Sequence, residues 1–131
     1  MTKKWWCLLW LGWILVITAV TTLPWSNFVG HSHWSSVRWI PLQGMQWNRD
    51  YLVDLTGNVL LFVPFGYLQM QAGLILPRRR LLSVSMAALA LSLGAELTQV
   101  YMHGRFPSAT DVLCNVTGAI LGGIIASFKL C

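Results

Sequence analysis

The stretch "DLTGNV" at residues 54–59 is partly repeated as "DVLCNV" at residues 111–116, and each copy opens a long apolar run. In both copies an Asp and an Asn lie four residues apart, which places their side chains on one face of a helix. Further identities follow at the same offset, namely Val59 with Val116 and Gly66 with Gly123. This repeat predicts two related helix hairpins, in which the second and fourth helices are equivalent.

The composition indicates lipid as the solvent of these helices. Of the 131 residues, 56% are hydrophobic and 10% are charged, against about 25% charged in soluble domains. Runs of about 20 apolar residues span a bilayer, and inside it they must satisfy their backbone as helices. We therefore predict an all-α integral membrane protein, a single domain over residues 1–131 with four transmembrane helices. The predicted spans are 5–23, 52–76, 81–101 and 109–130.

The distribution of basic residues predicts the orientation, because they gather on the cytoplasmic side. With a cytoplasmic N-terminus, six of the nine Lys and Arg lie inside: Lys3, Lys4, Arg78, Arg79, Arg80 and Lys129. We therefore predict that both termini are cytoplasmic and that the first apolar run is an uncleaved span rather than a signal peptide. The net charge of +5 is then a topology signal and not a sign of nucleic-acid binding.

The outer segment, residues 24–51, is rich in tryptophan, which favours the headgroup level of a membrane. Its four tryptophans are Trp25, Trp34, Trp39 and Trp47. The segment also carries His31 and His33, which raise the alternative of a metal site. Two histidines in a Ser-rich loop without a third ligand nearby are typical of a solvated loop, so we predict no metal and no cofactor. The three cysteines are an odd set and predict no disulfide framework.

A polar stripe follows one face of the third predicted helix. It consists of Ser92, Glu96, Gln99 and His103. Glu96 would lie about 6–8 Å below the outer end of its helix, at about the depth of Asn58 and Asn115. Ionisable groups inside a span are costly and normally face the bundle interior at functional sites. We therefore predict a polar cleft that opens outward.

Structural alternatives exist for several of these residues. Asp54 and Asp111 suit the N-caps of their helices, and Asn58 and Asn115 suit hydrogen bonds between helices. For Glu96 we predict an ion pair with Arg105, in the same pocket as Asp111 and Asn115. Two further features concern packing: Gly118 and Gly122 form a G-x-x-x-G stripe that lets helices approach closely, and Pro64 predicts a kink.

Three segments together resemble the VanZ-like family, whose name comes from a teicoplanin resistance protein. They are "DLTGNVLLFVPFG" at 54–66, "GAELTQ" at 94–99 and "GRFPSATDVLCNVTGAILG" at 104–122. The positions that match the family pattern are Asp54, Asn58, Pro64, Gly66, Glu96, Gln99, Arg105, Asp111, Asn115, Gly118 and Gly122. The resemblance implies a small multi-span protein of the bacterial cytoplasmic (inner) membrane, and it implies fold more firmly than activity.

The first functional hypothesis is binding of an amphiphilic or lipid-linked cell-envelope molecule, which includes a glycopeptide antibiotic such as teicoplanin. Its predicted ligand-binding residues are Asp54, Asn58, Glu96, Gln99, Arg105, Asp111 and Asn115. The alternative is an intramembrane hydrolase or transferase acting on a lipid-linked precursor. Glu96 or Asp111 would then be the general base and Arg105 would hold a phosphate or carboxylate. That scheme lacks a clear nucleophile, since Ser108 and Thr110 have no evident activating base beyond His103. A third hypothesis is a packing partner for another membrane protein.

Overall fold

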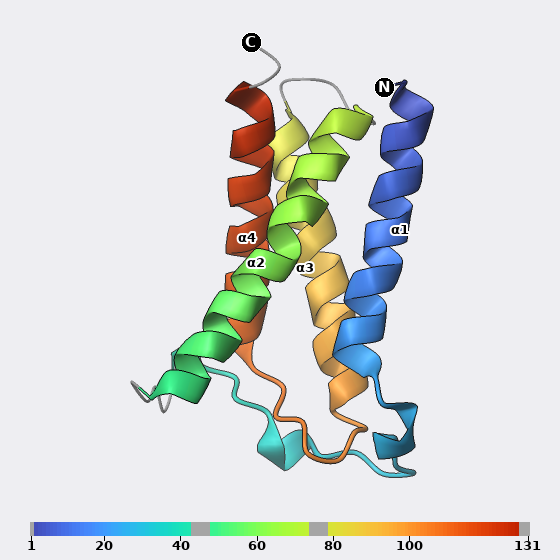
Figure 1. The fold of residues 1–131 in the computed structure, drawn as a ribbon. Helices are drawn as coiled ribbons and strands as arrows, with labels where there is room; N and C mark the ends of the chain where they lie inside the picture. The colour runs from blue at the N-terminus through green and yellow to red at the C-terminus, as the bar shows by residue number, and fades with distance from the viewer. Residues whose placement is uncertain (1, 43–47, 74–78, 129–131) are drawn as a thin grey trace.

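The structure is a computed structural model, and it describes residues 2–42, 48–73 and 79–128. Within these residues it contains no β-strand and four long helices, each long and apolar enough to cross a membrane (Figure 1). They are α1 (Lys3–Thr22), α2 (Arg49–Ala72), α3 (Arg80–Gln99) and α4 (Ala109–Phe128). The predicted fold class is therefore confirmed.

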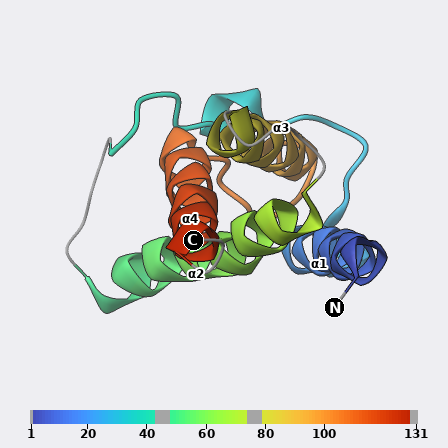
Figure 2. The ribbon, with the colours of Figure 1, turned by 90° about the horizontal axis from the view of Figure 1, so that it is seen from above.

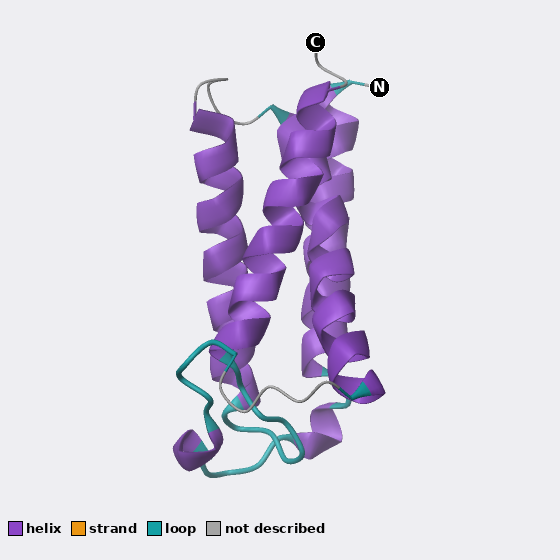
Figure 3. Cartoon of the chain, turned by 90° about the vertical axis from the view of Figure 1, so that its left-hand side faces the viewer, coloured by secondary structure: helices purple, strands orange, loops and turns teal. Residues whose placement is uncertain are grey.

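The helices alternate in direction along the chain. α1 begins and α4 ends at one end of the bundle, which we call the terminal end (Figure 1). Residues 23–42 and 100–108 lie at the opposite end, the loop end, where Figure 3 shows most of the irregular chain. α2 and α4 consequently point the same way, as a pair of equivalent helices would. A common origin of the two hairpins stays a prediction.

The helix boundaries differ from the predicted ones mainly at the loop end. α2 begins at Arg49, where the Asn48 side chain accepts a hydrogen bond of 2.8 Å from the backbone N–H of Tyr51. α3 ends at Gln99, so the predicted polar stripe loses its last member, His103, to the following turn. The predicted ends of the second and fourth spans, residues 74–76 and 129–130, lie outside the described residues.

Close packing of α2 on α4 depends on glycines, as the G-x-x-x-G pattern predicts. A Cβ at Gly118 would collide with the backbone carbonyl of Val59, and one at Gly122 with that of Val63. From the other side, Gly66 lies against the backbone of Ala119. The two backbones therefore touch over more than one helical turn, leaving no room for side chains between them.

The apolar core draws residues from all four helices. Its fully buried members include Ile17 of α1, Phe62 of α2, Ala88 of α3 and Ala119 of α4. α2 leans across α4, and its last turns lie beside α1 (Figures 1 and 2). The outward surfaces stay apolar, with Phe128 79% exposed, as expected for helices that face lipid rather than water.

The loop end is closed by backbone hydrogen bonds between the outer segment and the turn that joins α3 to α4. The N–H of Val29 donates to the carbonyl of Tyr101 (3.0 Å), and that of His103 donates to Asn27 (2.8 Å). Further along, Arg38 both donates to Pro107 and accepts from Ala109, each at 2.9 Å. These bonds thus hold the outer segment across the ends of the helices. Trp47, one of its four tryptophans, lies outside the described residues.

Candidate functional site

A polar cleft of about 500 Å³ opens at the loop end. All four helices contribute to it, together with the turn before α4. Its lining includes all seven of the predicted ligand-binding residues, namely Asp54, Asn58, Glu96, Gln99, Arg105, Asp111 and Asn115. Spacing along separate helices therefore predicted one three-dimensional gathering of polar groups. Whether they bind a ligand stays a prediction.

The two aspartates reach the cleft from different positions in their helices. Asp54 lies five residues after Arg49, the first residue of α2, so the N-cap alternative is wrong for it. Asp111 lies in the first turn of α4. The cap of that helix is Ser108, whose Oγ accepts a 3.1 Å hydrogen bond from the N–H of Thr110. Neither aspartate is an N-cap, which leaves both carboxylates available to the cleft.

Glu96 is buried, with 9% of its surface exposed, and its carboxylate is held by the backbone. Its Oε2 accepts a 2.7 Å hydrogen bond from the N–H of Ser108. The predicted ion pair with Arg105 is wrong, because the Arg105 guanidinium donates instead to the carbonyl of Leu23 at 3.3 Å. The early end of α3 lets the connecting turn place the start of α4 over Glu96, so a backbone N–H takes the position expected for the arginine.

The electrostatic balance of the cleft includes a cation that sequence reasoning missed. Arg105 still acts on Glu96 through space, and Arg38 acts on Asp111. Asp54 lies near enough to both acids to repel them. Arg38 comes from the outer segment, where no helical spacing links it to the cleft. Three carboxylates thus share the cleft with two guanidinium groups.

Two amide side chains that line the cleft also form hydrogen bonds between helices. Asn115 Nδ2 donates to the hydroxyl of Ser92 on α3 (2.8 Å), and Gln99 Nε2 donates to the carbonyl of Thr21 on α1 (3.2 Å). The bond of Asn115 fits the alternative predicted for that residue, hydrogen bonding between helices, and Gln99 makes such a bond without having been predicted to do so. The buried Oδ1 of Asn115, however, has no hydrogen-bond partner among the described residues. An orphaned buried acceptor is costly, and this one belongs to a residue that lines the cleft.

An apolar pocket of about 170 Å³ adjoins the polar cleft beneath the outer segment. Its walls include Trp34, Leu97 and Val112, and Glu96 and Ser108 line both the pocket and the cleft. The rings of Trp34 and Trp39 stack beside it, with centroids 6.2 Å apart and planes 5° apart. Glu96 therefore lies at a boundary between a polar and an apolar space.

A third histidine lies near His31 and His33, although the sequence predicts none there. The fold brings His103 beside them. The cluster was missed because His103 was predicted to extend the stripe on the third helix, whereas it lies on the turn after α3.

Four helices long and apolar enough to cross a membrane, with a polar cleft at one end, define the class of multi-pass membrane proteins. Within that class the chain belongs to the VanZ/LLP1 family, whose model matches residues 6–130, nearly the whole chain. This confirms the resemblance carried by the three sequence segments. Neither the curated proteins nor the solved structures gave a match.

Proposed function

We propose that the protein binds an amphiphilic or lipid-linked cell-envelope molecule, with the polar headgroup in the cleft. The observation that carries this proposal is the cleft itself. Seven polar residues predicted from separate segments line about 500 Å³ of space in a bundle whose outward surfaces are apolar. Polar and ionisable groups at membrane depth are costly and mark functional sites. A bound headgroup supplies further hydrogen-bond and charge partners to the groups that the cleft leaves accessible, such as the exposed Asp54.

The residues of the cleft define the chemistry of that headgroup. Three carboxylates accept hydrogen bonds from hydroxyl and ammonium groups. Arg38 and Arg105 suit a phosphate or carboxylate. A headgroup rich in hydroxyl or amino groups that carries one anionic group fits this set. Sugar-phosphate headgroups of lipid-linked envelope precursors have this character.

The adjoining apolar pocket suits the hydrocarbon part of the same molecule. It shares Glu96 and Ser108 with the cleft, so a ligand that passes this boundary places its chain between Trp34 and Leu97. A lipoglycopeptide antibiotic such as teicoplanin, with sugars, charges and an acyl chain, belongs to the same chemical class. Family membership and the cleft both agree with resistance by sequestration as one form of this function.

The hydrolase or transferase alternative receives less support from the geometry. Ser108 uses its hydroxyl to cap α4 and its N–H to bind the Glu96 carboxylate. A nucleophile needs its hydroxyl beside a base, and here the carboxylate contacts the backbone of the serine. A role as packing partner for another membrane protein would leave the cleft unexplained.

Asp111→Asn is expected to reduce the amount of co-purifying ligand at least about tenfold, because it removes a carboxylate from the cleft. The test is native mass spectrometry of protein extracted from its own membrane, with the bound mass identified by fragmentation. Asp50→Asn is the matched control. Asp50 also lies in the first turn of its helix, but it is exposed and outside the lining of the cleft.

Equal ligand retention in Asp111→Asn and Asp50→Asn would contradict binding in the cleft. So would wild-type protein that carries no bound molecule and gains none when incubated with lipid-linked envelope precursors. Both variants keep side chains of similar size, so a loss of folded protein in only one of them is not expected.

We also propose that the loop end faces the outside of the bacterial inner membrane, with both termini cytoplasmic. The support comes from Lys3 and Lys4 at the terminal end and from the basic residues between α2 and α3. A reporter that works only in the cytoplasm is expected to be active when it is fused after Cys131. A reporter that works only outside the cytoplasm is expected to be active when it is inserted at Ser35. The reverse pattern would place the cleft on the cytoplasmic side.

A further inference from the structure

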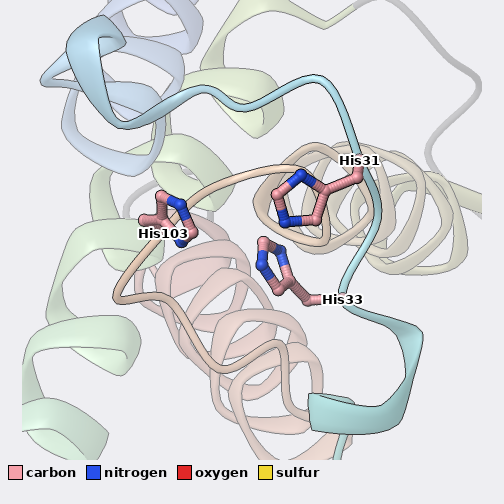
Figure 4. Close-up of side chains that lie close together, drawn as sticks. All are labelled: His31, His33 and His103. Carbon is pink, nitrogen blue, oxygen red and sulfur yellow. The ribbon is translucent and has the colours of Figure 1, made fainter.

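All three histidines of the chain come together at the loop end, although His103 lies 70 residues from His33 in sequence (Figure 4). The ring centroids of His31 and His33 are 4.8 Å apart, and those of His33 and His103 are 5.1 Å apart. One ring nitrogen from each residue lies within 4.8 Å of the others. Three neutral imidazoles that converge in this way form a typical donor set for a transition metal.

The backbone holds the two parts of this cluster in register before any ion binds. The N–H of His33 donates to the carbonyl of Val100 (2.8 Å), and the N–H of His103 donates to Asn27 (2.8 Å). These bonds strap the outer segment to the turn after α3 on both sides of the histidines. The convergence of the rings is therefore built into the fold and does not rest on side-chain rotamers alone.

The Nδ1 of His33 has a backbone carbonyl as its hydrogen-bond partner. It lies 3.2 Å from the carbonyl oxygen of Val100, which is only an acceptor, so Nδ1 carries the proton and donates it. The lone pair of His33 is then left on Nε2. Metal-binding histidines commonly donate their other ring N–H to a carbonyl in this manner, which fixes the tautomer and orients the ring.

We propose that His31, His33 and His103 bind a divalent transition-metal ion, of the zinc class, at the loop end. When three imidazoles bind Zn²⁺ in a tetrahedral arrangement, with Zn–N distances of about 2.0–2.1 Å, their ligating nitrogens lie roughly 3.3 Å from one another. The nitrogens here lie within 4.8 Å of one another, so modest side-chain rotations complete the site. Three protein ligands leave the fourth position for water or for an anionic group.

Such an ion would hold the outer segment in place at the loop end, above the cleft. The segment between His33 and Arg38 supplies Trp34 and Val37 to the apolar pocket and Arg38 to the cleft. Its backbone bonds to the turn after α3 already hold it there, and an ion between His33 and His103 would add a cross-link. The proposal stands on the histidine geometry and is independent of the ligand in the cleft.

The test is zinc titration of metal-stripped protein in lipid nanodiscs, purified with an affinity tag that contains no histidine. We expect one Zn²⁺ bound per chain, with affinity lowered at least about tenfold by His31→Ala and by His103→Gln. Cobalt(II) should also give the visible absorption of a tetrahedral site, and either variant should weaken it. Ser32→Ala, an exposed change between the two loop histidines, is the matched control and should bind like the wild type.

His31 is exposed, and neither its side chain nor that of His103 makes a hydrogen bond to another residue in the described parts of the chain, so both variants should unfold like the wild type without metal. His33→Ala is avoided as the main test because it removes the bond to Val100. Zinc binding by both His31→Ala and His103→Gln with wild-type affinity would overturn the proposal. So would wild-type protein that takes up no more zinc than the triple alanine variant of the three histidines.

Discussion

Gly122→Leu is expected to remove nearly all folded protein from the membrane. A Cβ at Gly122 would overlap the backbone carbonyl of Val63 and would lie 2.9 Å from the backbone nitrogen of Tyr67. These atoms cannot rotate away as a side chain could, so α2 and α4 must separate. Overpacking of a core typically costs about 1–3 kcal/mol, and loss of the neighbouring Gly118 contact with Val59 adds to it. Abundance in the membrane and the thermal unfolding midpoint in mild detergent measure the effect.

Gly12→Leu is the matched control, because an added Cβ at Gly12 has no atom within 4 Å and the residue is exposed on α1. Its abundance should equal that of the wild type. Gly122→Ala, which adds the Cβ alone, should fall between the two variants. If Gly122→Leu were as abundant and as stable as Gly12→Leu, the close contact of α2 with α4 would be wrong.

The sequence predicts the bundle well because its signals are local. An apolar run of about 20 residues can satisfy its backbone in lipid only as a helix. The spacing of Gly118 and Gly122 then indicates which face packs closely. The polar side chains of Asp54 and Asn58 share one helix face for the same geometric reason. Once the helices pack on their polar faces, a common cleft follows without knowledge of any loop.

The features of the site that the sequence did not predict depend on contacts that leave no pattern in the sequence. Arg38 enters the cleft, and His103 joins His31, because backbone hydrogen bonds strap the outer segment across the turn after α3. Every residue can accept such a bond and every residue except proline can donate one, so no residue type marks them. The bond from Ser108 N–H to Glu96 was missed for the same reason, and an arginine was expected in its place.

Glu96→Gln is expected to abolish ligand retention while leaving the protein folded. The carbonyl oxygen of the new amide can still accept the hydrogen bond that Ser108 N–H donates to the carboxylate. The bond over the start of α4 is thus kept, and the change is chiefly the replacement of one carboxyl oxygen by an amide NH₂ group where the cleft meets the apolar pocket. We expect at least about a tenfold loss of the bound molecule, equal to about 1.4 kcal/mol, with an unchanged unfolding midpoint. Arg105→Ala should lose at least as much, because it removes the cation that acts on Glu96.

Glu96→Leu separates the structural contribution of Glu96 from its contribution to binding. Leucine cannot accept the bond from Ser108, and an unsatisfied buried N–H costs about 1–3 kcal/mol, so this variant should lose stability as well as ligand. A carboxylate needed only for the fold would give a different pattern, in which Glu96→Gln retains ligand and Glu96→Leu loses ligand only as far as it loses folded protein. Native mass spectrometry of the bound molecule and thermal unfolding distinguish the two patterns. Both are measured on the same preparations of the wild type, Glu96→Gln and Glu96→Leu. Because the carboxyl group of Glu96 lies between the polar cleft and the apolar pocket, we expect the first pattern, in which this group contributes to recognition beyond the hydrogen bond that it accepts from Ser108.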